Sequence, residues 1–189
     1  MSEFPAPAFG TDAAEVLAHE RLYDGFLKID RYRFKCRLFE GGYSREFQRE
    51  VLVRQRGIGV LLYDPHLDKV LLVEQFRVGC LHDEHGGPWA LELVAGLLDT
   101  DETPEQVASR EAWEEAGVDV QTPLLKVAEY YNSPGGSDER ISVFCGRFDA
   151  RRTTGGIFGL AAESETSVLM CLIAPWPWRA CARAASATR

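Results

Sequence analysis

Residues 96–118 constrain the fold of this chain more than any other segment, because they predict a helix whose two ends are both marked. Thr103 is a favourable N-cap, and Pro104 suits the first helical position. Gln106 stands three residues after Thr103 and completes a capping-box pattern. Helix-forming residues then continue to Gly117, a natural helix stop. We therefore expect a loop, a helix and a second loop.

Strand-like patterns surround this helix. Two apolar runs, 58–62 and 70–73, are separated by a polar stretch and predict a hairpin of largely buried strands. Shorter strands are expected near 91–94, 124–131 and 141–148. Strands before and after one strong helix indicate an α/β or α+β sandwich.

The predicted helix carries several glutamates. Glu111 and Glu115 are four residues apart, so a helix places them on one face, about 6 Å apart. One interpretation is a solvated acidic face, the usual environment of charged helix residues. The other is half of a cation site, since Mg²⁺ prefers oxygen ligands, keeps several waters and pairs with substrate phosphates. Arg110, four residues before Glu114, is spaced to pair with it and orient the cluster.

The order of residues favours the cation site. From Gly96, five residues lead to Glu102 and seven more lead to Arg110-Glu111; an apolar residue, any residue, Glu-Glu, any residue, glycine and the apolar Val118 follow. This order resembles the Nudix box at every fixed position. The resemblance implies an α/β fold, an α/β/α sandwich around a mixed sheet. It also implies hydrolysis of a nucleoside diphosphate linked to another group, with Mg²⁺ or Mn²⁺ as cofactor.

The same resemblance implies roles for individual residues. Divalent cations would neutralise the polyanionic pyrophosphate, which otherwise repels a nucleophilic water. The implied metal ligands are the backbone carbonyl of Ala95 and the carboxylates of Glu111, Glu114 and Glu115, and Glu115 also counts as catalytic. The implied structural residues of the box are Gly96, Glu102, Arg110 and Gly117.

A second resemblance concerns the substrate. By composition, residues 133–139 (Ser-Pro-Gly-Gly-Ser-Asp-Glu) form a tight turn. Their sequence and their spacing from the box, however, resemble the ADP-ribose pyrophosphatase branch of the family, and the likeness covers roughly residues 20–165. It implies hydrolysis of ADP-ribose to AMP and ribose 5-phosphate. Two alternatives stay open: another sugar nucleotide such as GDP-mannose, or a catalytically impaired ligand-binding Nudix domain.

The branch resemblance also implies substrate contacts. Phe26 and Arg49 match positions that bind adenine across a homodimer, and an aromatic ring with a guanidinium suits a flat base. For Phe26, an ordinary core aromatic is an equal alternative. Arg77 matches an arginine that meets the diphosphate, with a surface-strand arginine as the alternative. The predicted substrate-binding set is completed by Gly96, Leu97 and Glu139.

The catalytic base is expected outside the helix. Residues 159–165 resemble the loop that carries the base in this branch, with Glu163 at the matching position and Glu165 as the neighbouring candidate. A carboxylate beside an activated water is a sensible nucleophile pair. For both residues, a solvated loop glutamate is the alternative.

Three parts are expected along the chain. Residues 1–50 form a loose arm, to about residue 20, and a small β domain, which the branch exchanges between subunits of a homodimer. Residues 51–165 form the Nudix domain. After Glu165 the resemblance stops, so residues 166–189 are interpreted as an aberrant tail in which the family's next strand and two helices are missing. Codons allowed for residues 165–169 read Asp-Ile-Arg-Val, a family string, in the neighbouring frame. A one-base frameshift is therefore a hypothesis that resequencing the gene would test.

Charge and composition limit the remaining classes of function. The net charge is −8, and because three of the 21 basic residues but none of the 29 acidic residues follow position 165, residues 1–165 carry −11. This charge argues against a nucleic-acid partner. The absence of a long apolar run or signal-peptide pattern argues against a membrane partner. Five scattered cysteines predict no disulfide framework. A cytoplasmic protein is expected, with a nucleotide sugar and a second copy of the chain as partners.

Overall fold

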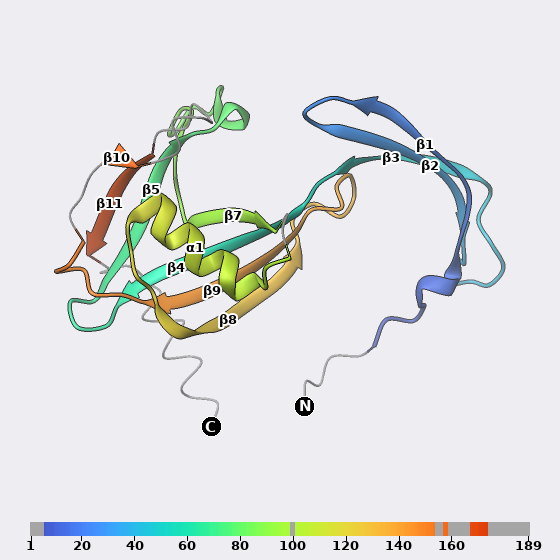
Figure 1. The fold of residues 1–189 in the computed structure, drawn as a ribbon. Coiled ribbons are helices and arrows are strands. Elements are labelled where there is room, and N and C mark those ends of the chain that lie inside the picture. The colour runs from blue at the N-terminus through green and yellow to red at the C-terminus, as the bar shows by residue number, and fades with distance from the viewer. Residues whose placement is uncertain (1–5, 99–100, 154–156, 159–166, 174–189) are drawn as a thin grey trace. The chain divides into compact units, whose positions relative to one another are not determined.

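The computed structural model describes residues 6–98, 101–153, 157–158 and 167–173 (Figure 1). The chain divides into two compact units. Unit 1 comprises Met1–Gln55 and Tyr131–Arg140, and unit 2 comprises Arg56–Tyr130 and Ile141–Arg189. The segment Tyr131–Arg140 is thus grouped with strands that lie far from it in the sequence.

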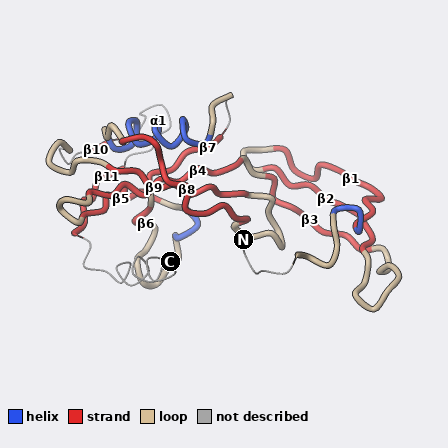
Figure 2. Tube along the Cα trace, turned by 90° about the horizontal axis from the view of Figure 1, so that it is seen from below, coloured by secondary structure: helices blue, strands red, loops and turns tan. Residues whose placement is uncertain are grey.

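Unit 1 is built on a three-stranded antiparallel sheet (Figures 1 and 2). A 3-10 turn, η1 (Thr11–Ala13), precedes β1 (Ala14–Asp24), β2 (Lys28–Cys36) and β3 (Phe47–Val53), which lie in the order β1-β2-β3. The expectation of a loose arm to about residue 20 is wrong from Ala14 onward. Backbone pairing with β2, from Ala14↔Cys36 to Asp24↔Lys28, holds β1 although its side chains show no apolar pattern.

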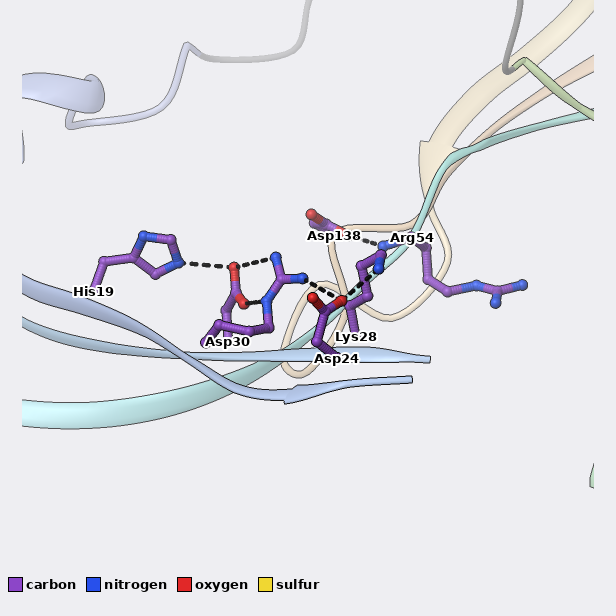
Figure 3. A network of polar contacts seen from close by, with 7 residues as sticks. His19, Asp24, Lys28, Asp30, Arg54 and Asp138 are labelled. Atoms are coloured by element: carbon purple, nitrogen blue, oxygen red, sulfur yellow. Dashed lines mark hydrogen bonds and ion pairs between the residues drawn. The ribbon is translucent and has the colours of Figure 1, made fainter. Parts of the chain in front are cut away.

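Charged side chains link the strands of unit 1. Asp30 of β2 is 3% exposed and accepts hydrogen bonds from Arg21 and from Nε2 of His19, the latter at 2.7 Å (Figure 3). The Arg21 guanidinium holds the pKa of Asp30 below its usual range. The His19 ring stacks on Tyr32, with centroids 4.4 Å apart. Among the described residues of unit 1, only Ala13 and Asp30 are buried, so this unit has little apolar core.

Unit 2 is built around a mixed sheet with the order β10-β11-β5-β4-β9-β8, in which β6 also pairs with β5 and β7 with β4. β4 and β9 run parallel, whereas β5 is antiparallel to β4, β6 and β11. The pairing Asp64↔Lys69 closes the predicted hairpin, which is confirmed. The elements are β4 (Arg56–Asp64), β5 (Lys69–Phe76), η2 (Val78–Cys80), β6 (Trp89–Glu92), β7 (Val94–Leu98), β8 (Gln121–Tyr131), β9 (Arg140–Arg147), β10 (Ile157–Phe158) and β11 (Ser167–Ile173).

The loop between β4 and β5 is held by a buried carboxylate. Asp64 is 1% exposed, and its Oδ1 accepts hydrogen bonds from the backbone N–H groups of His66 (2.7 Å) and Leu67 (3.1 Å). Its Oδ2 accepts from the N–H of Ala150, beyond the end of β9, at 2.8 Å. Burial raises the pKa of Asp64, but the three donors outweigh it and bring the pKa below its ordinary value. One side chain therefore joins two loops of unit 2.

The predicted helix is confirmed as α1 (Pro104–Ala116). Both halves of the capping box form: the N–H of Thr103 donates to Gln106 Oε1 at 2.7 Å, and the N–H of Gln106 donates to Thr103 Oγ1 at 3.3 Å. Gly117 ends the helix in the left-handed conformation, with φ of 60°. The side of α1 that packs on β4 and β7 carries small buried residues, which let the helix approach the sheet closely: Val107, Ala108, Ala112 and Ala116.

The core of unit 2 lies between α1 and the sheet, and Figure 2 shows α1 along one face of that sheet. Alternate residues of β4 and β5 enter this core, as the period-two pattern of a strand requires. The mixed sheet and its helix confirm the predicted α/β class. Within the described ranges α1 is the one α-helix, and no helix there is long and apolar enough to span a membrane. The buried sheet residues include Ile58, Val60, Leu62, Leu71, Val73, Val94 and Phe144.

The chain after position 166 contains a strand, contrary to expectation. β11 pairs antiparallel with β5 from Ser167↔Gln75 to Ile173↔Lys69. The interpretation that the strand is missing there is therefore wrong, because a short run of mostly apolar, extended-favouring residues suffices for pairing between β10 and β5. The frameshift itself stays a hypothesis, and residues 174–189 lie outside the described ranges.

Candidate metal and phosphate site

Glu115 lies where three elements of unit 2 meet. It projects from α1, and its Oε2 accepts a hydrogen bond from the N–H of Ala95 on β7 at 3.1 Å. Its Oε1 accepts from Nε2 of Gln75 on β5 at 3.2 Å. Burial, with a smaller contribution from the nearby charge of Glu111, raises the pKa of Glu115 to about 7 against the lowering effect of these two donors. A cation beside this carboxylate would favour its ionised form.

Glu111 lies against the backbone of Gly96. A Cβ at position 96 would fall 2.0 Å from Glu111 Oε1 and 2.2 Å from its Cδ, which is too close for any side chain. Gly96 is therefore required by the close approach of the carboxylate. Together with Glu115, which is bound to the N–H of Ala95, Glu111 brings two carboxylates to the same short stretch of β7.

Arg110 connects three glutamates of the box. Its Nη1 donates to Glu111 Oε1 at 2.7 Å and to Glu114 Oε2 at 2.9 Å, and its Nε donates to Glu102 Oε2 at 3.1 Å. Burial lowers the pKa of Arg110, but these carboxylates raise it above its ordinary value, so the guanidinium stays charged. The expected pairing of Arg110 with Glu114 is thus present, and Glu111 is fixed from a second side.

Arg77 supplies positive charge near this cluster. It follows directly after β5, and its Nε donates to Glu92 Oε2 of β6 at 2.6 Å. It also lowers the pKa of Glu115, so its guanidinium is within electrostatic reach of that carboxylate. Gln75 lies two residues earlier, within β5, so the extended backbone directs both side chains to the same side. Gln75 and Glu92 were not predicted from the sequence, although Gln75 is a polar residue that continues the buried alternation of Leu71 and Val73 and could have been noticed for that reason.

The donors fit an open site for a hard cation. Mg²⁺ is usually held by one or two carboxylates together with waters and substrate phosphates, rather than by a closed protein cage. Glu111 and Glu115 provide two carboxylates beside the strand backbone. The set therefore suits a cation that is completed by its substrate.

Comparison with known proteins identifies the architecture around these residues. The model of the NUDIX domain matches residues 53–175, about two thirds of the chain. The chain belongs to the Nudix family. Its box is the segment from Gly96 to Val118, and the cluster described above is built on it.

Several relatives of this Nudix protein are named for an enzymatic activity. It is 43% identical over 159 residues to the ADP-ribose pyrophosphatase of Haemophilus influenzae, covering 83% of this chain and 72% of that protein. It is 45% identical over 157 residues to the ADP-ribose pyrophosphatase of Escherichia coli K12, covering 83% and 74%. It is also 44% identical over 143 residues to the GDP-mannose pyrophosphatase of Klebsiella pneumoniae, covering 75% and 70%.

Similarity to a solved structure supports the fold alone. A structure described as an ADP compounds hydrolase matches with a TM-score of 0.56 at 16% identity, covering 71% of this chain and 66% of that one. The α/β architecture of the Nudix unit is therefore shared with an experimentally determined protein.

Three predicted substrate-binding residues belong to unit 1. Phe26 lies in the turn between β1 and β2 and is 96% exposed, so the core-aromatic alternative is wrong. Arg49 of β3 donates from Nη1 to the carbonyl of Gln48 at 2.8 Å, and its guanidinium carbon lies 4.9 Å from the ring centroid of Phe47. The side chains of Phe26 and Arg49 are not buried, so a ligand has access to both.

The turn that precedes Glu139 is attached to the end of β3. The N–H of Leu52 donates to the carbonyl of Gly136 at 2.9 Å, and the N–H of Arg54 donates to Asp138 Oδ1 at 2.6 Å (Figure 3). Glu139 itself accepts from Asn132 Nδ2 at 2.9 Å and from Arg54 Nε at 3.5 Å. The carboxylate predicted to contact substrate is thus held by two partners that the sequence analysis did not name.

Of the remaining predicted residues, the structure describes Leu97 but not Glu163 and Glu165. Leu97 of β7 pairs with Gly57 of β4 and is partly exposed beside Gly96. Glu163 and Glu165, the candidate bases, lie outside the described residues. The base therefore stays a prediction, whereas Gly96, Glu102, Arg110, Glu111, Glu114 and Glu115 are brought together in one cluster.

Proposed function

We propose that this Nudix protein hydrolyses the pyrophosphate bond of ADP-ribose, giving AMP and ribose 5-phosphate, with Mg²⁺ or Mn²⁺ as cofactor. The observation that carries the proposal is the approach of Glu111 and Glu115 to the backbone of Ala95 and Gly96. The substrate is supported by relatives that are named ADP-ribose pyrophosphatases and are 43–45% identical over 83% of the chain.

Each residue of the cluster has a distinct part in this proposal. When bound, the divalent cation would neutralise phosphate charge and promote ionisation of a water. Glu111 and Glu115 would hold the cation together with the carbonyl of Ala95, and Glu114 would be a further ligand. Arg77 binds a phosphate oxygen through a charge-assisted hydrogen bond, and Arg110 keeps the carboxylates oriented.

The proton from the attacking water requires an acceptor. We assign this part to Glu163, with Glu165 as the neighbouring candidate, because a carboxylate within hydrogen-bond reach of the water is a suitable general base. Replacing each in turn by glutamine separates them: the base is the residue whose loss removes the acidic limb of the pH–rate profile.

GDP-mannose is the competing substrate, because a relative that is 44% identical over a shorter stretch is named a GDP-mannose pyrophosphatase. The experiment compares kcat/KM for ADP-ribose and GDP-mannose with Mg²⁺ and with Mn²⁺, following AMP and GMP release. We expect a higher value for ADP-ribose. A higher value for GDP-mannose would replace the substrate, and binding without release of either nucleotide would identify an impaired ligand-binding domain.

We further propose that the protein works in the cytoplasm as a homodimer that uses residues 1–50 for association. The support is the near absence of a core in unit 1, which leaves large apolar side chains exposed and in need of cover. Light scattering on the purified chain tests the stoichiometry, with a monomer as the contrary result. The exposed residues include Val16, Leu22, Tyr23, Phe26 and Phe39.

A further inference from the structure

Gln75 is a polar residue at a core position. It lies on β5, where the alternate residues Leu71 and Val73 are fully buried, and it is itself only 5% exposed. A buried amide is costly unless its hydrogen-bonding groups are satisfied. In the structure, its Nε2 donates to Glu115 Oε1 at 3.2 Å. The strand thus accommodates a glutamine where an apolar residue would pack more simply.

The amide acts together with a backbone donor. The N–H of Ala95 binds Oε2 of the same carboxylate at 3.1 Å, so each oxygen of Glu115 has one donor. The donors come from β7 and β5, and the carboxylate comes from α1, which limits rotation about the last bond of the Glu115 side chain. Because a carboxylate oxygen has two lone pairs, a donor on each still leaves acceptor capacity for a cation.

The amide of Gln75 donates a hydrogen bond to Glu115 without carrying a charge. A lysine or arginine at position 75 would cancel the negative charge that attracts a cation, and an acidic residue would repel Glu115. A glutamine donates a hydrogen bond and leaves the charge of the carboxylate intact. We propose that Gln75 is a positioning residue that orients Glu115 for divalent-cation binding; this rests on the metal site of the proposed function.

The test compares Gln75→Met with a matched control. Methionine keeps the length and volume of glutamine but cannot donate a hydrogen bond. Ser142→Ala is the control, because Ser142 is 1% exposed in β9 and donates to Glu129 without contacting the site. Mn²⁺ affinity of the substrate-free proteins is measured by electron paramagnetic resonance, and the Mn²⁺ concentration for half-maximal hydrolysis and the KM for ADP-ribose at saturating Mn²⁺ are measured alongside.

We expect Gln75→Met to bind Mn²⁺ about 10- to 100-fold more weakly, as is usual when the partner of a metal ligand is lost. The half-maximal Mn²⁺ concentration should rise in parallel, with KM for ADP-ribose at saturating Mn²⁺ changed less than about twofold. Ser142→Ala should match the wild type in Mn²⁺ binding. If Gln75→Met does not fold by circular dichroism, Gln75→Asn, whose amide is one methylene too short, is judged by the same measurements.

Mn²⁺ affinity within about twofold of wild type in the folded variant would overturn the role of Gln75, as would wild-type protein that binds no Mn²⁺. Failure of the proposed activity is recognised separately. If wild type binds Mn²⁺ but releases no AMP from ADP-ribose, the substrate assignment is wrong, and the comparison of Mn²⁺ affinities still decides the role of Gln75.

Discussion

The carboxylate of Glu111 lies in the space that a side chain at position 96 would need, since a Cβ there would be 2.0 Å from Glu111 Oε1. The glycine at the start of the box is therefore explained by the carboxylate that comes fifteen residues later. This relationship leads directly to a test of the site.

Gly96→Ala should force the Glu111 side chain away from β7 and lower kcat/KM for ADP-ribose about 100-fold, because a displacement near 1 Å at a reacting centre has effects of this size. Steady-state kinetics with Mg²⁺ measures it. Gly57→Ala is the control, since its new Cβ would lie 3.5 Å from Ile141, an ordinary contact. Equal activity of the two variants would contradict the steric explanation.

Glu115→Gln should reduce turnover more than 100-fold, beyond the effect typical of residues that only support a metal ligand. The metal-free variant should keep or gain thermal stability, because a neutral amide removes a buried carboxylate next to the charge of Glu111. Measuring turnover and Tm on one preparation checks both the loss of activity and the retained stability. A variant with unchanged turnover would refute the ligand role.

Arg77→Ala should raise KM for ADP-ribose at least about tenfold, since a hydrogen bond to a charged group contributes about 1.5–3 kcal/mol. Arg151→Ala is the control, because Arg151 is exposed and pairs only locally with Asp149. Initial rates over a range of ADP-ribose concentrations separate KM from kcat. An unchanged KM would leave Arg77 as a partner of Glu92 alone.

Asp64→Asn should lower the free energy of unfolding at pH 7 by about 1–3 kcal/mol, because the asparagine cannot accept from all the N–H groups that face the carboxylate. The folded pKa of Asp64 lies below the ordinary 3.8. Its ionised form therefore stabilises the fold above about pH 4, and this stability is lost as pH falls through the folded pKa.

The difference between wild type and Asp64→Asn should accordingly shrink on acidification. Urea unfolding at pH 7, 5 and 3 measures it, with the exposed Asp119→Asn as the control. A difference that stays constant over this range would show that the carboxylate charge is not what holds the two loops.

Local signals made the helix and its carboxylates predictable. Thr103, Gln106 and Gly117 mark the ends of α1 through hydrogen bonds within a few residues, and the spacing of Glu111 and Glu115 sets their common face. Gln75 and Glu92 could not be assigned in this way. Their roles depend on strand pairing and on distant partners, which no local pattern specifies.

The first strand illustrates the same limit. β1 is nearly all exposed and has no alternation of apolar residues, so its sequence resembles a loop. Its conformation follows from backbone pairing with β2 and from ion pairs such as that between Arg21 and Asp30. Non-local contacts of this kind become visible only when the strands are placed together.

The pairing between β11 and β5 determines how much sequence change this part of the fold can tolerate. Backbone groups form this ladder, so it depends on an extended segment of suitable length rather than on particular side chains. A segment of different sequence that keeps an extended backbone can therefore pair in the same way with β5, the strand that bears Gln75. Substitutions within Ser167–Ile173 that preserve this backbone pairing should therefore leave that side of the Gln75 strand covered.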